Sequence, residues 1–326
     1  MSRYKTFDRS KLKIRSLFER ESKTGLDSMI NPDSKPPKLT SGEYQQIRRI
    51  SSEIISSRKN QRPVLFAYGA HAVKNGCSSI IIRMMEEGLI QQLLTNGAGV
   101  IHDFELSYLK RTEEDVRKYL PTGEFGLWQE TDSLLNRTIN AGAKLDKGIG
   151  ESVGELISSN KNKFQGSNYS IVGNAYKLKI PFSSCIGIGY DIIHEHPEAD
   201  GASLGKASYT DFLIFVQSVS EAQGGVFLSV GSAIMAPMVL EKALSMARNV
   251  AKQKKEKIDN FLIAVNDIQP ATWDWSKGEP PKSNPAYYSR FCKSFSRMNT
   301  PFLYVDMDNR KFLHNLYSEI KNKSNK

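Results

Sequence analysis

Apolar residues in the central part of the chain occur in two patterns that take turns along the sequence. In "GEYQQIRRISSEIISSRKN", Ile47, Ile50, Ile54 and Ile55 recur at the three- and four-residue spacing of an amphipathic helix. The run "PVLFAYGAH" that follows is apolar, has the length of a strand and ends in small residues. This stretch therefore predicts a helix that leads into a buried strand.

The same two patterns then repeat to about residue 267. Further helices are expected in "CSSIIIRMMEEG", closed by Gly88, and in "VIHDFELSYLK", "YSIVGNAYKLK", "SYTDFLIFVQSVSEA" and "MVLEKALSMARNVAKQKKE". Further strands are expected in "LIQQLLT", "IPFSSCIGIG", "GGVFLSVGSA" and "DNFLIAVND". Strands that alternate with helices predict an α/β, Rossmann-like fold, in which helices cover both faces of a mostly parallel sheet.

In such sheets, ligands bind beyond the carboxyl ends of the strands. The segments expected there contain four of the five histidines, namely His71, His102, His194 and His196. One of these segments, "TNGAGVIHDFE", places two glycines before the predicted start of a helix, where backbone amides and the helix dipole favour a phosphate. The alternative is a tight turn without a ligand. The dinucleotide fingerprint GxGxxG is absent, since "GIGYDI" has only its first two glycines.

The segment "DIIHEHPEAD" gathers imidazoles and carboxylates within ten residues. Asp191, His194, His196, Glu198 and Asp200 could bind zinc or iron, or they could form hydrogen bonds to a ligand above the sheet. The spacing leaves both interpretations open.

Residues 1–42 precede the regular pattern and end in "NPDSKPPKLTSGE", which is typical of a linker or surface arm. We expect an N-terminal arm over residues 1–42, without a role in the core, and one catalytic domain over residues 43–326. The net charge of +10 is spread along the chain, and basic runs such as "KQKKEK" lack interleaved aromatic residues, so no nucleic-acid partner is expected.

Cys77, Cys185 and Cys292 are too widely spaced for a disulfide framework or a zinc motif. No stretch has the length of a membrane span or the form of a signal peptide. A soluble protein of the cytoplasm is expected, with no resident metal.

From about residue 63 to residue 293, the order of these segments resembles the deoxyhypusine synthase family, whose members bind NAD and transfer an aminobutyl group to a lysine. "YGAHAVKNG" and "TNGAGVIHDFE" occupy the places of its NAD-contacting loops, "GEFGLW" keeps a Gly-Glu-Phe, and "YYSRFCK" is similar to the loop of the catalytic lysine. The resemblance implies NAD as the cofactor, with contacts from His71, Lys74, Asn75, Gly76, Thr95, Asn96, Gly97, Ala98, Gly99, Asp200, Gly231 and Ser232.

The chain departs from the family where a polyamine would bind. His102 and Asp103 stand in place of two glutamates, and Lys206 replaces an acid. The resemblance thus implies dehydrogenation of an amine other than spermidine. The expected substrate is a small amine or an amino acid, whose carboxylate would be held by Lys206 or Arg290. Lys293 would form the imine, His102 would act as general base, and Asp103 would be the third catalytic residue. Substrate contacts are expected from Asp191, His194, His196, Lys206 and Arg290.

Two other functions remain open at this point. One is a metal-assisted hydrolase or lyase that uses Asp191, His194 and His196, and the other is a non-catalytic NAD-binding protein. The family resemblance also implies a homotetramer or homodimer, with the N-terminal arm given to a neighbouring subunit.

Overall fold

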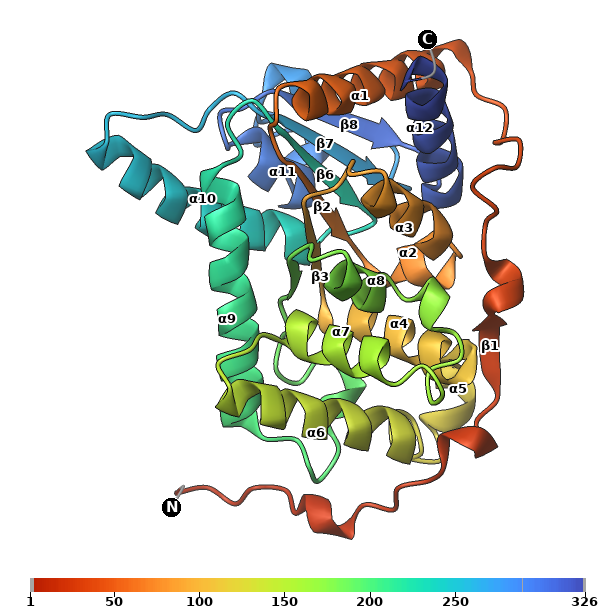
Figure 1. Ribbon diagram of the computed structural model, residues 1–326. Coiled ribbons are helices and arrows are strands. Elements are labelled where there is room, and N and C mark those ends of the chain that lie inside the picture. The colour runs from red at the N-terminus through yellow and green to blue at the C-terminus, as the bar shows by residue number, and fades with distance from the viewer. Residues whose placement is uncertain (1–2, 289, 325–326) are drawn as a thin grey trace.

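The computed structural model describes residues 3–288 and 290–324, apart from the side chains of residues 276, 290, 291 and 324. Its centre is a parallel sheet of six strands in the order β5-β3-β2-β6-β7-β8 (Figure 1). The strands are β2 (Val64–Tyr68), β3 (Gln92–Thr95), β5 (Phe182–Ser184), β6 (Val226–Val230), β7 (Leu262–Asp267) and β8 (Phe302–Asp306). The α/β, Rossmann-like fold class predicted above is confirmed.

Helices cover both faces of this sheet. They are α1 (Ser41–Lys59), α2 (Ala70–Lys74), α3 (Ser78–Glu86), α4 (Gly97–Leu109), α5 (Val116–Tyr119), α6 (Gln129–Lys144), α7 (Ile149–Ser159), α8 (Ile171–Lys177), α9 (Gly201–Ser220), α10 (Met235–Gln253), α11 (Arg290–Ser296) and α12 (Asn309–Ser324). The long apolar periodicities noted in the sequence correspond to α1, α9 and α10.

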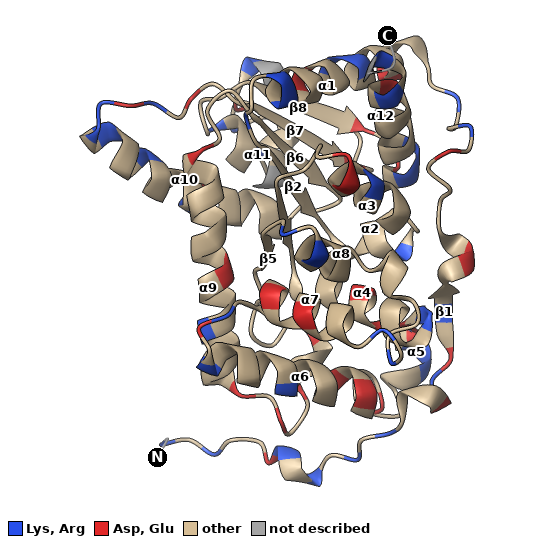
Figure 2. Cartoon of the chain, in the orientation of Figure 1, with Lys and Arg blue, Asp and Glu red and all other residues tan. Residues whose placement is uncertain are grey.

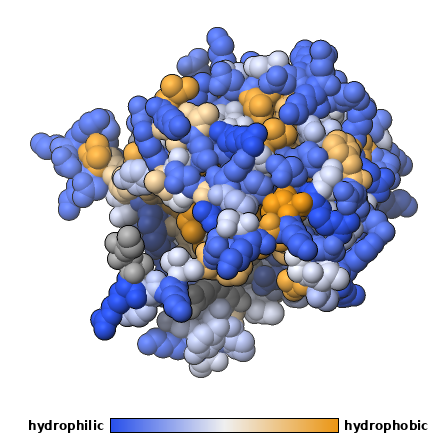
Figure 3. Space-filling view, turned by 90° about the horizontal axis from the view of Figure 1, so that it is seen from below, coloured by the Kyte–Doolittle hydropathy of each residue, from blue (hydrophilic) through white to orange (hydrophobic). Residues whose placement is uncertain are grey.

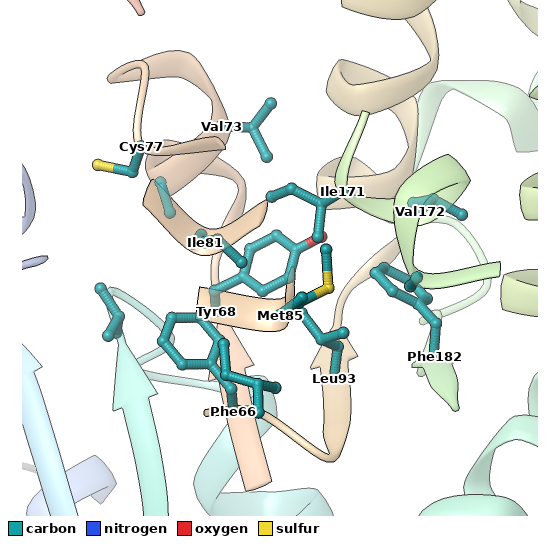
Figure 4. Close-up of a cluster of buried hydrophobic side chains, with 14 of the residues drawn as sticks. Phe66, Tyr68, Val73, Cys77, Ile81, Met85, Leu93, Ile171, Val172 and Phe182 are labelled. Carbon is teal, nitrogen blue, oxygen red and sulfur yellow. The ribbon is translucent and has the colours of Figure 1, made fainter. Parts of the chain in front are cut away.

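Strand β2 shows why the sheet needs two helical layers. Its side chains point alternately to opposite faces, and all five of its residues are buried. Phe66 and Tyr68 join the core beneath α1, α3, α8 and α12, whereas Leu65 and Ala67 join the core beneath α9, α10 and α11. On the first face, the Tyr68 ring lies among apolar side chains that include Ile81, Met85, Leu93, Ile171 and Phe182 (Figure 4).

Some elements were not predicted from the sequence. Besides β8 and α12, a second sheet pairs β1 (Ser22–Gly25) with β4 (Arg111–Glu114) in antiparallel fashion, with Thr24 opposite Thr112. These short strands contain mostly polar residues, so they carry no hydrophobic signal of a strand.

The N-terminal arm packs against its own chain, and the expectation that it has no core role is wrong. Leu17 is fully buried with Tyr119 and Trp128, and Ile30 joins the main core. Phe7 and Phe18 remain exposed. The molecule viewed from the side where the arm begins shows separate apolar patches on a largely hydrophilic surface (Figure 3). The boundary at residue 42 and the homo-oligomer stay predictions.

Charge is mixed over the surface of the chain. Basic and acidic residues are interspersed on the arm and on the outer faces of the helices (Figure 2). In the part of the chain that the structure describes, no helix has both the length and the apolar composition needed to cross a bilayer.

Candidate functional site

The sheet has a switch point between β2 and β6. The chain proceeds from β2 to β3 and β5 on one side, and then from β6 to β7 and β8 on the other. This is the strand order of dinucleotide-binding folds, in which the ligand lies across the crevice where the order reverses. Here Gly69 follows β2 and Gly231 follows β6, and a methyl group on Gly69 would lie 2.0 Å from the carbonyl oxygen of Gly231. Only glycine permits this approach of the two chains.

The turn from β6 to α10 lies at this switch point. Gly231 has φ +58°, a left-handed conformation that favours glycine, and its amide donates to the carbonyl of Asn266 at 2.9 Å. The hydroxyl of Ser232 accepts from the amide of Ala236. The buried side-chain oxygen of Asn266 has no hydrogen-bond partner. The turn therefore lies beside an unpaired side-chain acceptor on β7.

The turn from β3 to α4, where the sequence predicted a pyrophosphate, is closed by the chain itself. Asn96 caps the helix by accepting from the amide of Gly99. The carboxylate of Asp191 faces the first turn, and a methyl group on Gly97 would lie 2.2 Å from one of its oxygens. Burial raises the pKa of Asp191 to about 6, although the amide of Ala98 donates to its carboxylate and favours the charged form. A phosphate could bind at this turn only after Asp191 has moved away.

A cavity of about 250 Å³ opens beside α4. Ile101 and His102 of α4 line it together with Phe125, Tyr190 and Ile192. The other lining residues are Arg20, Lys74, Ala98, Glu105, Glu113, Glu114, Val116 and Asp191. Its wall is thus assembled from the N-terminal arm, α2, α4, β4 and the loop after β5.

Acidic groups outnumber basic groups in this cavity. Arg20 forms a two-point ion pair with Glu105, at 2.7 and 2.8 Å, in which both side chains are only 1% exposed. Lys74 pairs with Glu113 at 3.3 Å. Glu114 and Asp191 add two carboxylates to these balanced pairs. Burial raises the pKa of Glu114, even though the indole of Trp128 donates to it at 2.7 Å. The cavity therefore favours a cationic ligand.

His102 presents its imidazole to the same cavity. Its Nδ1 lies 2.7 Å from the hydroxyl of Thr112, which in turn lies 2.6 Å from the carboxylate of Glu105. Burial lowers the pKa of His102 to about 4, against the opposing effect of Glu105. The ring is therefore neutral at pH 7, and one of its two nitrogens carries a free lone pair.

Helix α2 connects the cavity to the crevice. His71 lies in its first turn and Lys74 at its end, a rise of about 4.5 Å. Burial and the charge of Lys74 lower the pKa of His71, while Glu113 at the cavity and Asp267 at the end of β7 act in the opposite direction. The charge of His71 is thus affected by Glu113 at the cavity and by Asp267 at the end of β7.

Asp103 faces away from the cavity, into the core. Its carboxylate accepts from the amide of Ile171 at 2.6 Å and from the hydroxyl of Ser170, and so it caps α8. Burial raises its pKa to about 7. Asp211, also fully buried, accepts from the amide of Gly150 at the start of α7. Asp103 therefore stabilises the start of α8, and we do not propose it as a catalytic residue.

The histidines of the loop after β5 make local contacts. His194 Nδ1 accepts from the amide of Asp191, and His196 Nδ1 accepts from the amide of Glu198. Asp200 caps α9 through Ser203. Among the described residues, no three side chains of His, Cys, Asp or Glu are placed to share a metal ion. The arrangement of the described residues therefore does not support the metal-assisted alternative.

Two of the three predicted lysines, Lys206 and Lys293, lie elsewhere. Lys206, on an exposed face of α9, pairs with Asp146 at 2.6 Å. Lys293 on α11 places its ammonium group 3.7 Å from the centre of the Tyr287 ring. Arg290 begins α11, but its side chain is outside the described part. Neither Lys206 nor Lys293 lines the cavity.

The remaining predicted contacts divide between packing and the cavity. Asn75 donates to the side chain of Asn309 at 2.9 Å, and Gly76 packs directly against the backbone of Ser28. The hydroxyl of Thr95 donates to the carbonyl of Tyr68. Ala98 and Lys74 line the cavity.

Sequence reasoning missed most of the charged lining. Arg20 was assigned to an arm without a core role, and Glu113 and Glu114 fall in "RTEEDV", a polar stretch that reads as a surface loop. The one available signal was Glu105, three residues after His102, which places both side chains on one face of a helix.

No protein-family model and no curated protein matches this chain. Solved structures do. A putative LOR/SDH protein from Methanococcus maripaludis S2 is 14% identical over 90% of this chain and 71% of its own, with a TM-score of 0.53. AgrE, solved as a ternary complex with ornithine and NAD+, is 15% identical over 88% of this chain and 34% of its own, with a TM-score of 0.52. Another AgrE structure contains L-arginine.

ArgZ, an arginine dihydrolase of the ornithine-ammonia cycle in cyanobacteria, matches with a TM-score of 0.50 and 15% identity over 85% of this chain. The chain spans about a third of the length of AgrE and ArgZ, at 34% and 33%. A putative deoxyhypusine synthase from Entamoeba histolytica aligns with a TM-score of 0.48 and 9% identity, which is too low to support an argument. At these identities the likeness establishes the fold.

Proposed function

We propose that this protein is an NAD-dependent enzyme that dehydrogenates a cationic amine or amino acid. The observation that carries the proposal is the contact of Gly69 with Gly231 at the switch point of the sheet, one short helix away from an acidic cavity. The NAD and ornithine in the complex of AgrE, whose fold is similar, support the same pairing of ligands.

The residues at the crevice fit a dinucleotide. Gly69 and Gly231 bring the ends of β2 and β6 together with no side chain between them, and the turn at Ser232 precedes α10, a helix of 19 residues whose N-cap residue makes no side-chain capping hydrogen bond. We therefore place the pyrophosphate at Gly231 and Ser232 and not at Gly97. The fingerprint glycines of many dinucleotide sites are lacking, as the sequence already showed. NAD, when bound, supplies the hydride acceptor.

The cavity would hold the amine. Glu114 and Asp191 attract its positive charge, and the side chains of Ile101, Phe125 and Ile192 contact its carbon chain. His102 would accept the proton that the nitrogen releases during oxidation. A carboxylate anchor at Lys206 is not part of this proposal, because Lys206 is paired with Asp146 on the surface. Imine formation on Lys293 stays a prediction.

Calorimetric titration with NAD tests the cofactor site. The variants S232D and S232N have side chains of the same shape, and either can accept from the amide of Ala236 as the hydroxyl does. S232D adds a negative charge beside the pyrophosphate and should weaken NAD binding at least tenfold, about 1.4 kcal/mol. S232N should stay within about threefold of the wild type. Equal affinities in all three proteins, or no binding by the wild type, would contradict the placement.

Turnover separates an enzyme from a non-catalytic NAD-binding protein. The protein with NAD is incubated with ornithine, arginine, lysine, putrescine and spermidine, and NADH is followed by its absorbance. The proposal expects NADH with at least one of these amines. Binding of NAD without NADH from any of them would favour the non-catalytic alternative.

A further inference from the structure

The carboxylate of Glu105 accepts four hydrogen bonds from neighbouring side chains. Arg20 donates twice, at 2.7 and 2.8 Å, and the hydroxyls of Thr131 and Thr112 donate at 2.9 and 2.6 Å. Burial would raise the pKa of Glu105, but the charge and hydrogen bonds of Arg20, together with His102 and the hydrogen bond from Thr112, hold the pKa below its usual value. Glu105 is therefore ionised, and a carboxylate has no proton to donate.

This fixes the direction of the next hydrogen bond. The hydroxyl of Thr112 has a single proton, which points to Glu105. In its contact with His102 at 2.7 Å, the oxygen of Thr112 can only accept, so Nδ1 of His102 is the nitrogen that carries hydrogen. A neutral imidazole has one protonated nitrogen, and Nε2 is left with a free lone pair.

The position of the His102 ring places its Nε2 on the side of the cavity. Thr112 is fully buried, whereas the His102 ring lines the cavity. With Nδ1 engaged by Thr112, Nε2 is the nitrogen that a ligand can reach. From these contacts we infer that Thr112 is a positioning residue, which holds His102 in the Nδ1-protonated form so that Nε2 serves as a proton acceptor in the cavity. The catalytic part of this inference rests on the proposed function, but the tautomer does not.

The proton balance of the proposed reaction requires such an acceptor. When an ammonium group is oxidised to an iminium ion, a C–H bond breaks and its electron pair leaves with the hydride, which reduces NAD+ to NADH. A C=N bond forms from the electrons of an N–H bond, and the proton of that bond is released. Nε2 of His102 accepts this proton. The Nε2-protonated tautomer could not, because its lone pair would face Thr112.

The tautomer can be measured without substrate or cofactor. Two-bond 1H–15N NMR spectra distinguish the two neutral tautomers of each of the five histidines, and H102Q identifies the signals of His102. We expect His102 to be Nδ1-protonated and neutral from pH 6 to pH 8. An Nε2-protonated His102 in the wild type would overturn the inference, whatever the enzyme activity.

Two substitutions of Thr112 supply the matched comparison. T112V keeps the shape of the side chain and removes the acceptor, so His102 should shift toward the Nε2-protonated form. T112S keeps the hydroxyl and should restore the wild-type spectrum. If the amine reaction is found, T112V should lower kcat by about a hundredfold with little change in KM, and T112S should stay within about threefold. A T112V spectrum like that of the wild type would refute the role of Thr112. Should NADH never form while the spectra behave as expected, the proposed function fails and the positioning contact stands.

Discussion

Two helices that follow strands of the central sheet begin with similar small residues, but the surroundings of their first turns differ. Helix α4 starts at "TNGAGV" after β3, and α10 follows "VGSAIM" after β6. Both turns are rich in small residues, and either could bind a phosphate on sequence grounds. At α4, however, Asn96 caps the helix and Asp191 faces its first turn, whereas at α10 the hydroxyl of Ser232 accepts from the amide of Ala236 and the turn lies at the switch point of the sheet.

The difference shows what decides whether a glycine turn is a ligand site. Glycine leaves room for an approach, but any part of the protein can occupy that room. Gly97 admits the carboxylate of Asp191, and Gly69 admits the backbone of Gly231. The first glycine thus admits a side chain at a helix start, and the second lets two strand ends meet at the switch point of the sheet. Three substitutions, in order of decreasing expected effect, test this comparison.

Gly69→Ala should have the largest effect. The added methyl group would meet the carbonyl of Gly231 at 2.0 Å, and backbone atoms on both sides cannot yield cheaply. Overpacking of this kind should lower the free energy of unfolding by about 2 kcal/mol or more. The matched control is Gly205→Ala on α9, where no atom lies within 4 Å, and it should stabilise the protein by about 0.5 kcal/mol. Urea unfolding of both variants measures the difference, and equal stabilities would mean that β2 and β6 do not meet at Gly69.

Asp191→Asn should change how stability depends on pH. Burial raises the pKa of Asp191 to about 6, so the folded state holds this proton more tightly than the unfolded state. The protonated form contributes fully below about pH 4, and that contribution is lost as the pH rises through 6. Between pH 4 and pH 8, the wild type should therefore lose about 2 kcal/mol relative to Asp191→Asn.

A nearby acid provides the control for that experiment. Asp200 caps α9, and its pKa is lowered by the hydroxyl and amide of Ser203. Asp200→Asn should therefore shift the pH dependence in the opposite direction. Unfolding of both variants at several pH values gives the comparison, and a difference between wild type and Asp191→Asn that stays constant with pH would contradict the buried position of Asp191.

Lys206→Ala should have the smallest effect. Its partner Asp146 is largely exposed, and exposed ion pairs contribute less than about 1 kcal/mol. We expect a change in unfolding free energy below about 0.5 kcal/mol and no change in the affinity for NAD or for any amine substrate. A clear loss of amine affinity would return Lys206 to the substrate site and favour a carboxylate-bearing substrate.

The segment "TNGAGVIHDFE" shows how far the site could be predicted. Its mixture of glycines, an imidazole and two acids correctly marks the carboxyl end of a strand and the start of a helix. The sequence does not show that its two acids serve different purposes. Asp103 and Glu105 are two positions apart on a helix, so they face different sides, one toward α8 and the other toward Arg20 and Thr112.

The sequence by itself determined the fold class, because helical and strand periodicities are local and their alternation favours a mostly parallel sheet covered by helices. It also placed the glycine turns at the ends of strands. Only the tertiary structure decided which turn is covered by a distant side chain and which residues form the cavity. Asp191 reaches α4 from nearly a hundred residues away, and Arg20 reaches Glu105 across 85 residues. Burial, ion pairing and the direction of a hydrogen bond depend on such distant neighbours, which no local pattern records.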